Sequence, residues 1–555
     1  MNVVALVVAF GLLLICGVEW AASYYVAQQH ADASDEIAGT LEAPWKTISR
    51  AAKTLEPDDT VIICTGIYRE YVEPARGGTP GLPITYRSAE GQEVIVTGAD
   101  IVTGWRRVNK GIWKKDPWPY RFPTHPNDER HHLIGRCEQV IVSGKLIKQV
   151  EGLNDVCPGA FFADTKATVL YVSPPDGVDL NEQKVEVSVR PICFGIPRGG
   201  EPLSHVRLFG ISIRYAANSA QRGALSVQGD HWTIEDCTVE WTNGSGIFFR
   251  GNNVTFRRVR SRHNGQQGLA GSGRDFSLEE VVLDHNNVKG FDKGWEAGGF
   301  KIVRARNGVV RRCAAIANNG VGFWFDIDVR DVVVEQCLCR DNAGHGIYVE
   351  ISGGFQIRDN LCVRNGTDDE WGYGGVSTAE SDHCIIEHNT CVLNPTGISI
   401  REQGPRTFEG GGREKVSYRV QDITIQRNIC ALNTKYQFGL WWDNTFFGPH
   451  PSAGSRGTAY DPDECNMHID HNLYWTEDRQ RLTLWGCPWR PKHKKYADLT
   501  AWQRERAFDS SSLFASPAFV DQEHDDWNLT SDSPAHKIQA GPRARIFPRG
   551  VPRSS

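Results

Sequence analysis

Two carboxylates, Asp326 and Glu350, occupy equivalent places in a recurring phrase of this sequence. Each is the fourth residue after a glycine, Gly322 and Gly346 respectively. If both segments are strands of one parallel sheet, these side chains stand on neighbouring strands about 4.8 Å apart. Like charges so placed repel each other, and the pKa of at least one should rise unless a cation lies between them. Such a pair suits acid–base chemistry, metal binding or a solvated polar face.

The phrase that places these carboxylates is glycine followed by alternating apolar residues. It reads Gly246-Ile-Phe-Phe-Arg250, Gly268-Leu-Ala-Gly-Ser272, Gly322-Phe-Trp-Phe-Asp326, Gly346-Ile-Tyr-Val-Glu350, Gly375-Val-Ser-Thr-Ala379 and Gly397-Ile-Ser-Ile-Arg401. The glycines are 22, 54, 24, 29 and 22 residues apart, and Gly299 divides the interval of 54. Repeats of this length, made of short strands and Asn or Gly turns, predict a parallel β-helix.

Strand alternation then predicts which side chains share a face. The first and third residues after each glycine should fill the core, and the second and fourth should point outward. One outward column is Arg250, Ser272, Val303, Asp326, Glu350, Ala379 and Arg401, and the other is Phe248, Ala270, Lys301, Trp324, Tyr348, Ser377 and Ser399. Asp328 follows at a strand end, Trp295 and Glu296 border the same face, and the phrase starting at Gly439 adds Trp441 and Asp443.

Composition excludes some classes of function. The 555 residues carry a net charge of −6, and the one basic run, at 490–495, is short, so we expect no nucleic-acid partner. Many of the 15 cysteines recur at fixed places, for example Cys339, Cys362, Cys391 and Cys430. We interpret these as ladders of free, buried thiols rather than as disulfides or a metal site.

The chain divides into five predicted regions. Residues 1–22 are apolar and end in small residues, as in a secretory signal peptide, with an uncleaved membrane anchor as the alternative. Residues 23–99 form an N-terminal cap, including a helix near 43–52, and the first rungs. Residues 100–204 break the repeat and form an inserted small β-domain, 205–480 are the β-helix core with loops on one face, and 481–555 are C-terminal loops and a cap.

The opening and closing segments support a resemblance. Trp45-Lys-Thr-Ile48, Gly66-Ile-Tyr68-Arg-Glu70, Phe519-Val-Asp521 and Ser533-Pro-Ala535 are similar to segments of secreted right-handed parallel β-helix proteins of the pectate-lyase-like class. The inserted domain resembles one found in some β-helix glycoside hydrolases. The resemblance implies an all-β, right-handed parallel β-helix, a secreted or periplasmic location and a polysaccharide substrate. It leaves the reaction open, because this class contains hydrolases and lyases.

Three functions follow as alternatives. The favoured one is a glycoside hydrolase with Glu350 as acid/base and Asp326 as nucleophile or base, a reversible assignment in which Asp328 or Glu296 could pair across the groove. Trp295, Trp324, Tyr348 and Trp441 would stack on sugars, and Lys301, Arg401 and Asp443 would hold polar groups. The second is a lyase on uronic-acid polymers, with calcium held by Asp326, Asp328 and Glu350, and Lys301 or Arg401 as base. The third is a non-catalytic glycan-binding or surface protein. Under each alternative we expect a monomer.

Overall fold

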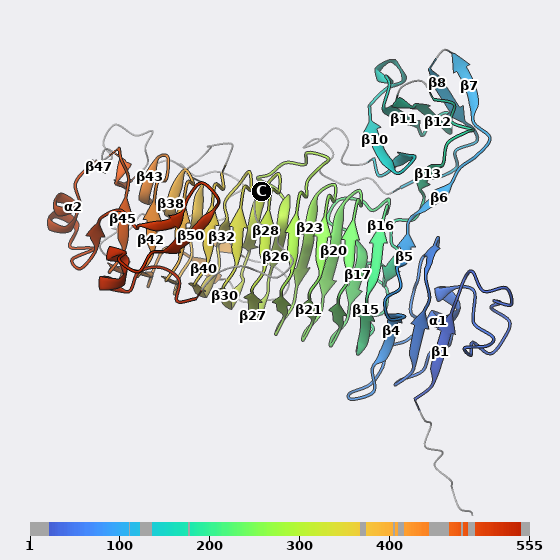
Figure 1. The fold of residues 1–555 in the computed structure, drawn as a ribbon, viewed down its shortest axis with the longest axis horizontal. Helices are drawn as coiled ribbons and strands as arrows, with labels where there is room; N and C mark the ends of the chain where they lie inside the picture. Colours follow the sequence, from blue (N-terminus) through green and yellow to red (C-terminus); the bar gives the residue numbers. More distant parts are fainter. Residues whose placement is uncertain are drawn as a thin grey trace, which may run out of the picture.

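The chain coils into a solenoid whose wall consists of three long β-sheets (Figure 1). The computed structural model describes residues 21–109, 111–122, 136–175, 178–366, 373–402, 406–408, 416–442, 465–478, 481–486 and 494–544. Sheet A has 13 strands from β1 (Ser23–Val26) to β44 (His468–Asp470). Sheet B has 13 strands from β3 (Gly66–Tyr68) to β48 (Leu513–Phe514). The predicted all-β class and parallel β-helix are confirmed.

Sheet C has 12 strands and carries the outward columns described above. Its strands are β14 (Phe194–Gly195), β17 (Gly223–Gln228), β20 (Ser245–Arg250), β23 (Gln267–Ser272), β26 (Gly298–Val303), β29 (Val321–Asp326), β32 (Ile347–Glu350), β35 (Gly374–Ala379), β38 (Thr396–Glu402), β43 (Tyr436–Trp442), β46 (Thr483–Trp485) and β47 (Lys494–Tyr496). All neighbours are parallel except β46 and β47.

Each rung contributes one strand to each sheet, and one rung shows how the repeat folds. β27 (Arg306–Arg311) lies in sheet A, β28 (Ala314–Ile316) in sheet B and β29 in sheet C. In β29, Phe323 and Phe325 are fully buried in the core, as the alternation predicts. Phe323 stacks on Phe300 of the preceding rung, with ring centroids 4.7 Å apart. Alternation therefore places Trp324 and Asp326 on the outer face.

A ladder of asparagine side chains stabilises one of the turns in each rung. At the turn from sheet B to sheet C, the ladder runs through Asn264, Asn286, Asn318, Asn342, Asn365, Asn394 and Asn433. Within it, Asn342 Oδ1 accepts hydrogen bonds from the backbone N–H and the Nδ2 of Asn318, at 3.2 and 2.8 Å. Because these groups are buried, the ladder satisfies donors that would otherwise cost free energy on folding.

The cysteines also stack rung on rung. Cys339, Cys362, Cys391 and Cys430 pair in register on successive strands of sheet B. All four are buried, and the cysteines that the structure describes are free thiols. In this ladder Cys serves as a small core residue, as predicted.

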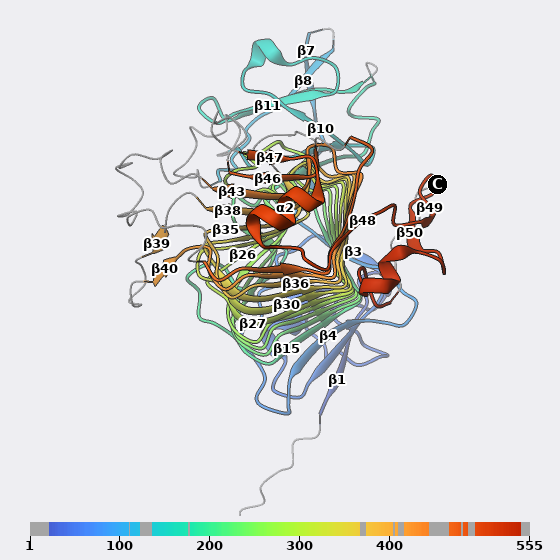
Figure 2. The same cartoon turned by 90° about the vertical axis from the view of Figure 1, so that its left-hand side faces the viewer.

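Helices close the two ends of the solenoid. α1 (Ile48–Thr54) follows the N-capping side chain of Thr47 and buries Ile48, Ala51 and Ala52. α2 (Leu499–Arg506) lies across the far end, where Trp502 is fully buried (Figure 2). No helix in the described ranges is long and apolar enough to cross a membrane. The predicted signal segment, 1–22, lies almost entirely outside the described residues.

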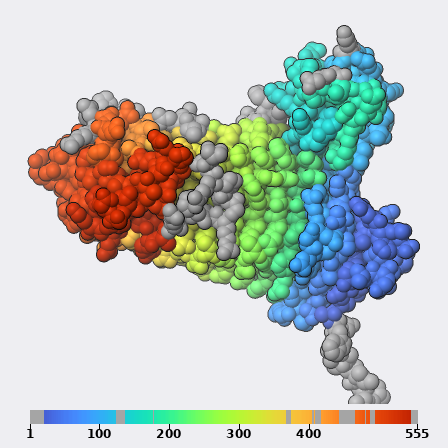
Figure 3. Space-filling view, in the orientation of Figure 1, coloured from blue at the N-terminus to red at the C-terminus, as the bar shows by residue number. Residues whose placement is uncertain are grey.

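The insertion forms its own eight-stranded sheet and stands off the solenoid near its N-terminal end (Figure 3). The sheet extends from β6 (Ala99–Ile101) to β13 (Val185–Ser188) in the chain. The predicted boundary at 204 is too late, because Phe194 in β14 already pairs with Leu225 inside the solenoid. Phe194 continues the sheet C stack and belongs to the solenoid core.

The C-terminal segment differs from the predicted cap. α2 covers the end of the coil, while β49 (Phe519–Asp521) and β50 (Asp526–Leu529) fold back along the outside of sheet B. Phe519 and Trp527 pack there against Leu361 and Val363. These outward apolar residues of sheet B are the physical reason for the difference, since they need a cover.

Candidate functional site

The outer face of sheet C assembles the predicted cluster in the predicted register. Asp326 lies opposite Glu350 on the next strand, and Trp324 lies opposite Tyr348. Lys301 lies opposite Trp324 on the preceding strand. The two carboxylates are therefore direct neighbours, as the spacing of the glycines indicated.

The carboxylate pair is held between cations. Lys301 Nζ lies 2.9 Å from Asp326 Oδ2. Arg406 donates a hydrogen bond of 2.6 Å to Glu350 Oε1, and Trp324 Nε1 donates one of 3.2 Å to Glu350 Oε2. Asp326 Oδ1 is buried and has no hydrogen-bond partner in the part of the chain that the structure describes. A buried carboxylate oxygen without a hydrogen-bond partner is unusual in a folded protein and marks Asp326 as a candidate functional residue.

The environment shifts the pKa values of Asp326 and Glu350 in opposite directions. Burial, followed by the charge of Glu350, raises the pKa of Asp326 to about 6, although Lys301 opposes the shift. Burial acts on Glu350 in the same sense, but the charges of Arg406 and Arg401 outweigh it and lower the pKa of Glu350. A pair of titratable groups driven apart like this is typical of an acid–base site. The two carboxyl groups titrate as a coupled pair. At a pH between the two pKa values of the pair, the pair carries one proton.

Trp324 and Tyr348 are buried beneath the charged groups. Their exposed fractions are 4% and 6%, and Lys301 Nζ lies 3.7 Å from the centre of the Trp324 ring. Arg401 donates a hydrogen bond of 2.6 Å to the Tyr348 hydroxyl. The expectation that these two rings stack on sugars does not fit this burial. Instead, Trp324 orients Glu350 and Lys301, and Tyr348 orients Arg401.

Asp328 lies in the turn that follows β29, away from the Asp326–Glu350 pair. Both Ile327 and Asp328 have left-handed backbone φ angles, 56° and 60°, which turn the chain from sheet C toward sheet A. The Asp328 carboxylate is 3.1 Å from Arg306 and accepts a hydrogen bond of 2.5 Å from the Tyr418 hydroxyl. Asp328 therefore stabilises the turn after β29 and the segment that carries Tyr418. Its contacts are separate from the Asp326–Glu350 pair.

The residues present do not fit the calcium site considered above. Calcium takes six to eight oxygen ligands. Here Asp326 faces Lys301, Glu350 faces Arg406, and Asp328 faces Arg306. No group of three or more His, Cys, Asp or Glu side chains in the described ranges converges in a way that could hold a metal ion.

Glu296 and Lys301 border a groove of about 740 Å³ across the outside of β17, β20, β23 and β26. The groove ends at Lys301, which contacts Asp326 and whose Nζ also donates a 2.9 Å hydrogen bond to the Trp295 carbonyl. The structure places Glu296 on the predicted face. The Trp295 side chain packs beside Ala220, Phe291 and Ala297.

The phrase at Gly439 lies two residues out of its predicted register. Gly439 pairs with Ser399, and Trp441 pairs with Arg401. Trp441 therefore belongs to the column of Asp326 and Glu350 rather than to that of Trp324, and it is 2% exposed. The reason is that Gln437, not a glycine, begins this repeat and takes part in the asparagine ladder. Asp443 lies outside the described residues.

Sequence reasoning missed three residues around the pair. Arg406 comes from β39 (Arg406–Phe408), part of a hairpin with β40 (Val416–Tyr418) that stands outside the coil (Figure 2). Arg406 also lies 3.4 Å from the fully buried carboxylate of Glu380. His345 stacks on Tyr348 with centroids 4.2 Å apart, and burial lowers the pKa of His345 to about 3. The sequence could have indicated Glu380, because it directly follows Ala379, the outward residue of its rung. No feature of the sequence indicated Arg406.

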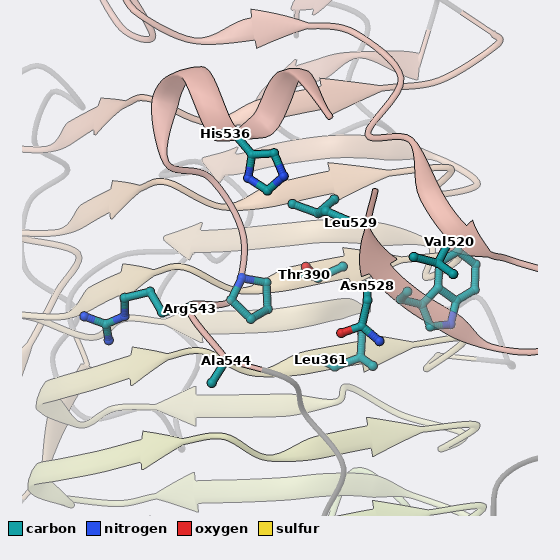
Figure 4. Close-up of a pocket in the computed structure, with 10 residues that line it drawn as sticks. Leu361, Thr390, Val520, Asn528, Leu529, His536, Arg543 and Ala544 are labelled. Carbon is teal, nitrogen blue, oxygen red and sulfur yellow. The ribbon is translucent and has the colours of Figure 1, made fainter. Parts of the chain in front are cut away.

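A second hollow lies between the C-terminal segment and sheet B (Figure 4). It measures about 380 Å³, and its walls include Leu361, Trp527 and His536. Arg543 at its edge pairs with Asp359. Its lining on sheet B and the absence of a carboxyl pair among the described lining residues distinguish it from the site on sheet C.

Comparison with known proteins supports the fold. A family model described as a right-handed beta helix region matches residues 223–391. The Bacillus subtilis (strain 168) protein YwoF, described as uncharacterized, is 23% identical over 532 residues, which cover 91% of each chain. Pectate lyase L of Paenibacillus polymyxa (strain SC2) is 24% identical over 283 residues, covering 47% of this chain and 54% of the lyase.

Among solved structures, a complex of XylC with xylose superposes with a TM-score of 0.67. It is 17% identical and covers 90% of this chain and 87% of XylC. Identities at this level establish the fold and no more. The chain has the right-handed parallel β-helix fold that the repeat predicts.

Proposed function

We propose that the protein is a glycoside hydrolase in which Asp326 and Glu350 are the two reacting carboxyl groups. The observation that carries the proposal is their in-register pairing on one face, with pKa values driven in opposite directions. Glycoside hydrolysis needs one protonated and one ionised carboxyl group beside the scissile bond. The ligand-free pair supplies both at mildly acidic pH.

The spacing of the pair supports retention of configuration. Facing residues of adjacent parallel strands lie about 4.8 Å apart. Retaining enzymes hold their carboxyl groups about 5–5.5 Å apart, whereas inverting enzymes need about 6.5–9.5 Å to admit a water molecule. The proposed reaction therefore forms a glycosyl-enzyme ester, which water then hydrolyses.

Two observations bear on the division of roles and point in opposite directions. The pKa directions place the proton of the free protein on Asp326, which suits Asp326 as the acid. In contrast, Asp326 Oδ1 has no hydrogen-bond partner among the described residues, while both Glu350 oxygens accept hydrogen bonds, which suits Asp326 as the nucleophile. The proposal therefore assigns the reaction to the pair, and trapping of the glycosyl-enzyme assigns the roles.

The test is mass spectrometry of products from a panel of neutral and acidic polysaccharides. Products that each carry one added water support the hydrolase, and loss of these products in Asp326→Asn and Glu350→Gln ties the activity to the pair. Binding of a glycan by the wild-type protein without any product would instead support the non-catalytic alternative.

A polysaccharide lyase is the second candidate. The observation that favours it is the position of Lys301, a cation that lines the groove and touches Asp326. In this alternative Lys301 abstracts the proton next to a uronate carboxylate. Its products would be unsaturated and would lack the added water, so the same measurement separates the two reactions.

We also propose that the protein acts outside the cytoplasm as a monomer. The support for the location is the apolar run at 3–18 and the polymeric nature of the proposed substrate. Cell fractionation of the full-length protein, with N-terminal sequencing of the mature form, tests the location. Light scattering of the purified protein tests the oligomeric state.

A further inference from the structure

The groove beside the carboxylate pair combines an open floor with several cations. Small residues form its floor where β23 passes, namely Ala270, Gly271, Ser272 and Gly273. Its walls carry five cationic side chains, Arg198, Arg222, Arg250, Lys301 and Arg304. The whole protein has a net charge of −6, so this concentration of positive charge is local.

Three of these arginines have no carboxylate within ion-pair distance in the described part of the chain: Arg198, Arg222 and Arg250. Arg222 is half-buried, and burial, together with the charge of Arg198, lowers the pKa of Arg222. Elsewhere on the solenoid, outward arginines such as Arg260 and Arg311 pair with a carboxylate on a neighbouring rung. Like charges left together at a concave surface are stabilised by an anionic ligand.

Two acidic residues also face the groove, and among the described residues neither forms an ion pair with Arg198, Arg222 or Arg250. Asp230 accepts hydrogen bonds from the backbone and side-chain nitrogens of Asn252, at 2.7 and 3.2 Å. Glu296 comes from the insertion that precedes Gly298, beside Lys301 at the opposite end.

The groove is aligned with the carboxylate pair. Arg250 and Asp326 belong to the same outward column, separated by Ser272 and Val303. They are thus three strand spacings apart, about 14 Å. Phe248, half-buried in the second column, faces the groove between Arg250 and Lys301, where its ring can lie against the apolar face of a sugar.

We propose that this groove binds the uronic-acid part of an acidic glycan, whose carboxylates are held by Arg222 and Arg250. The inference rests on the proposed function, because it treats the groove as the part of the substrate site next to the bond cleaved at Asp326 and Glu350. Arginine suits a carboxylate through two parallel hydrogen bonds. A neutral glycan would leave the three arginine charges uncompensated.

The test is calorimetric titration of the full-length Asp326→Asn protein, which cannot turn over the ligand. The ligands are oligosaccharides of galacturonic, glucuronic, mannuronic and guluronic acid, each compared with its carboxyl-reduced counterpart. At least one acidic ligand should bind about tenfold more tightly than its reduced form. Adding Arg222→Gln or Arg250→Gln should remove most of this preference, and added salt should weaken it.

Arg207→Gln provides the matched control, because Arg207 is exposed on sheet A, outside the groove. It should leave the preference unchanged. Equal binding of acidic and reduced ligands throughout the panel would overturn the inference, as would an equal loss in Arg207→Gln. If the acidic preference is found but the wild-type protein hydrolyses no glycan, the proposed function fails and the binding site stands.

Discussion

Lys301 and Asp326 form an ion pair, with 2.9 Å between Nζ and Oδ2, although each side chain is only 8% exposed. Desolvation of both charges is costly, and such pairs are weak contributors to stability. One Asp326 oxygen remains buried without a hydrogen-bond partner among the described residues, on the strand next to a second carboxylate. This arrangement is easier to understand as a reactive site than as a stabilising contact, and it yields the following predictions.

Removal of either carboxylate should abolish hydrolysis. We expect Asp326→Asn and Glu350→Gln each to lower kcat by about 10²–10⁴-fold, the usual contribution of a positioned acid or base. Circular dichroism should show that both variants remain folded. Glu90→Gln, at an exposed carboxylate far along the chain, is the control and should keep full activity.

The two variants should also reveal which carboxylate is the nucleophile. With a substrate that has a good leaving group, azide restores turnover to the variant that lacks the nucleophile and gives a product of inverted configuration. Azide acting on the variant that lacks the acid/base gives a product of retained configuration. Proton NMR of the azide product distinguishes the cases. Inverted products from the wild-type protein would contradict the retaining mechanism.

Activity should follow a bell-shaped pH profile. The reaction needs one proton on the pair, so activity should fall as pH rises through the pKa of Asp326, about 6. It should also fall at low pH as Glu350 becomes protonated, below its ordinary value of 4.5 because the pKa of Glu350 is lowered. Initial rates between pH 3 and 9 check this. A flat profile between pH 5 and 8 would exclude the assignment.

Lys301 should control the alkaline limb of that profile. Its charge opposes the rise in the pKa of Asp326, so Lys301→Gln should move the limb above pH 6. Lys301→Arg keeps the charge and should leave the limb close to its original position. Complete loss of an unsaturated product in both variants would instead support Lys301 as the base of a lyase.

Arg406 should control the acidic limb. Its charge is the largest influence that lowers the pKa of Glu350 against burial, so Arg406→Gln should raise that pKa and narrow the profile from the acidic side. The same measurement on Arg207→Gln serves as the control. An unchanged acidic limb in Arg406→Gln would show that the hairpin of β39 and β40 does not act on the pair.

The asparagine ladder should contribute measurably to stability. Asn342→Leu leaves the backbone N–H and the Nδ2 of Asn318 without their shared acceptor. We expect a loss of about 1–3 kcal/mol, seen as a lower thermal midpoint. Asn154→Ala, at an exposed asparagine of the inserted domain, should change the midpoint far less. Equal effects would mean that the ladder adds no stability beyond an ordinary surface contact.

The repeat alone determined the solenoid and the pairing of Asp326 with Glu350. Side chains alternate strictly along a strand, so a glycine at a constant place identifies the inward and outward residues of every rung. The same reasoning placed Lys301 and Trp324 on one face and the cysteines in a buried ladder. It failed at Gly439, where Gln437 replaced the expected glycine and shifted the phrase by two residues.

Only the tertiary structure decided what surrounds the pair. Arg406 arrives from a hairpin 56 positions along the chain from Glu350, a contact that no repeat encodes. Burial of Trp324 and Tyr348 depends on neighbouring rungs and loops. Their aromatic type suggested that they stack on sugars, whereas their packing gives them a positioning role. Likewise, Asp328 is two residues from Asp326 but turns the corner toward Arg306 and Tyr418. Periodic order follows from local alternation, whereas charge balance and desolvation depend on contacts between distant segments.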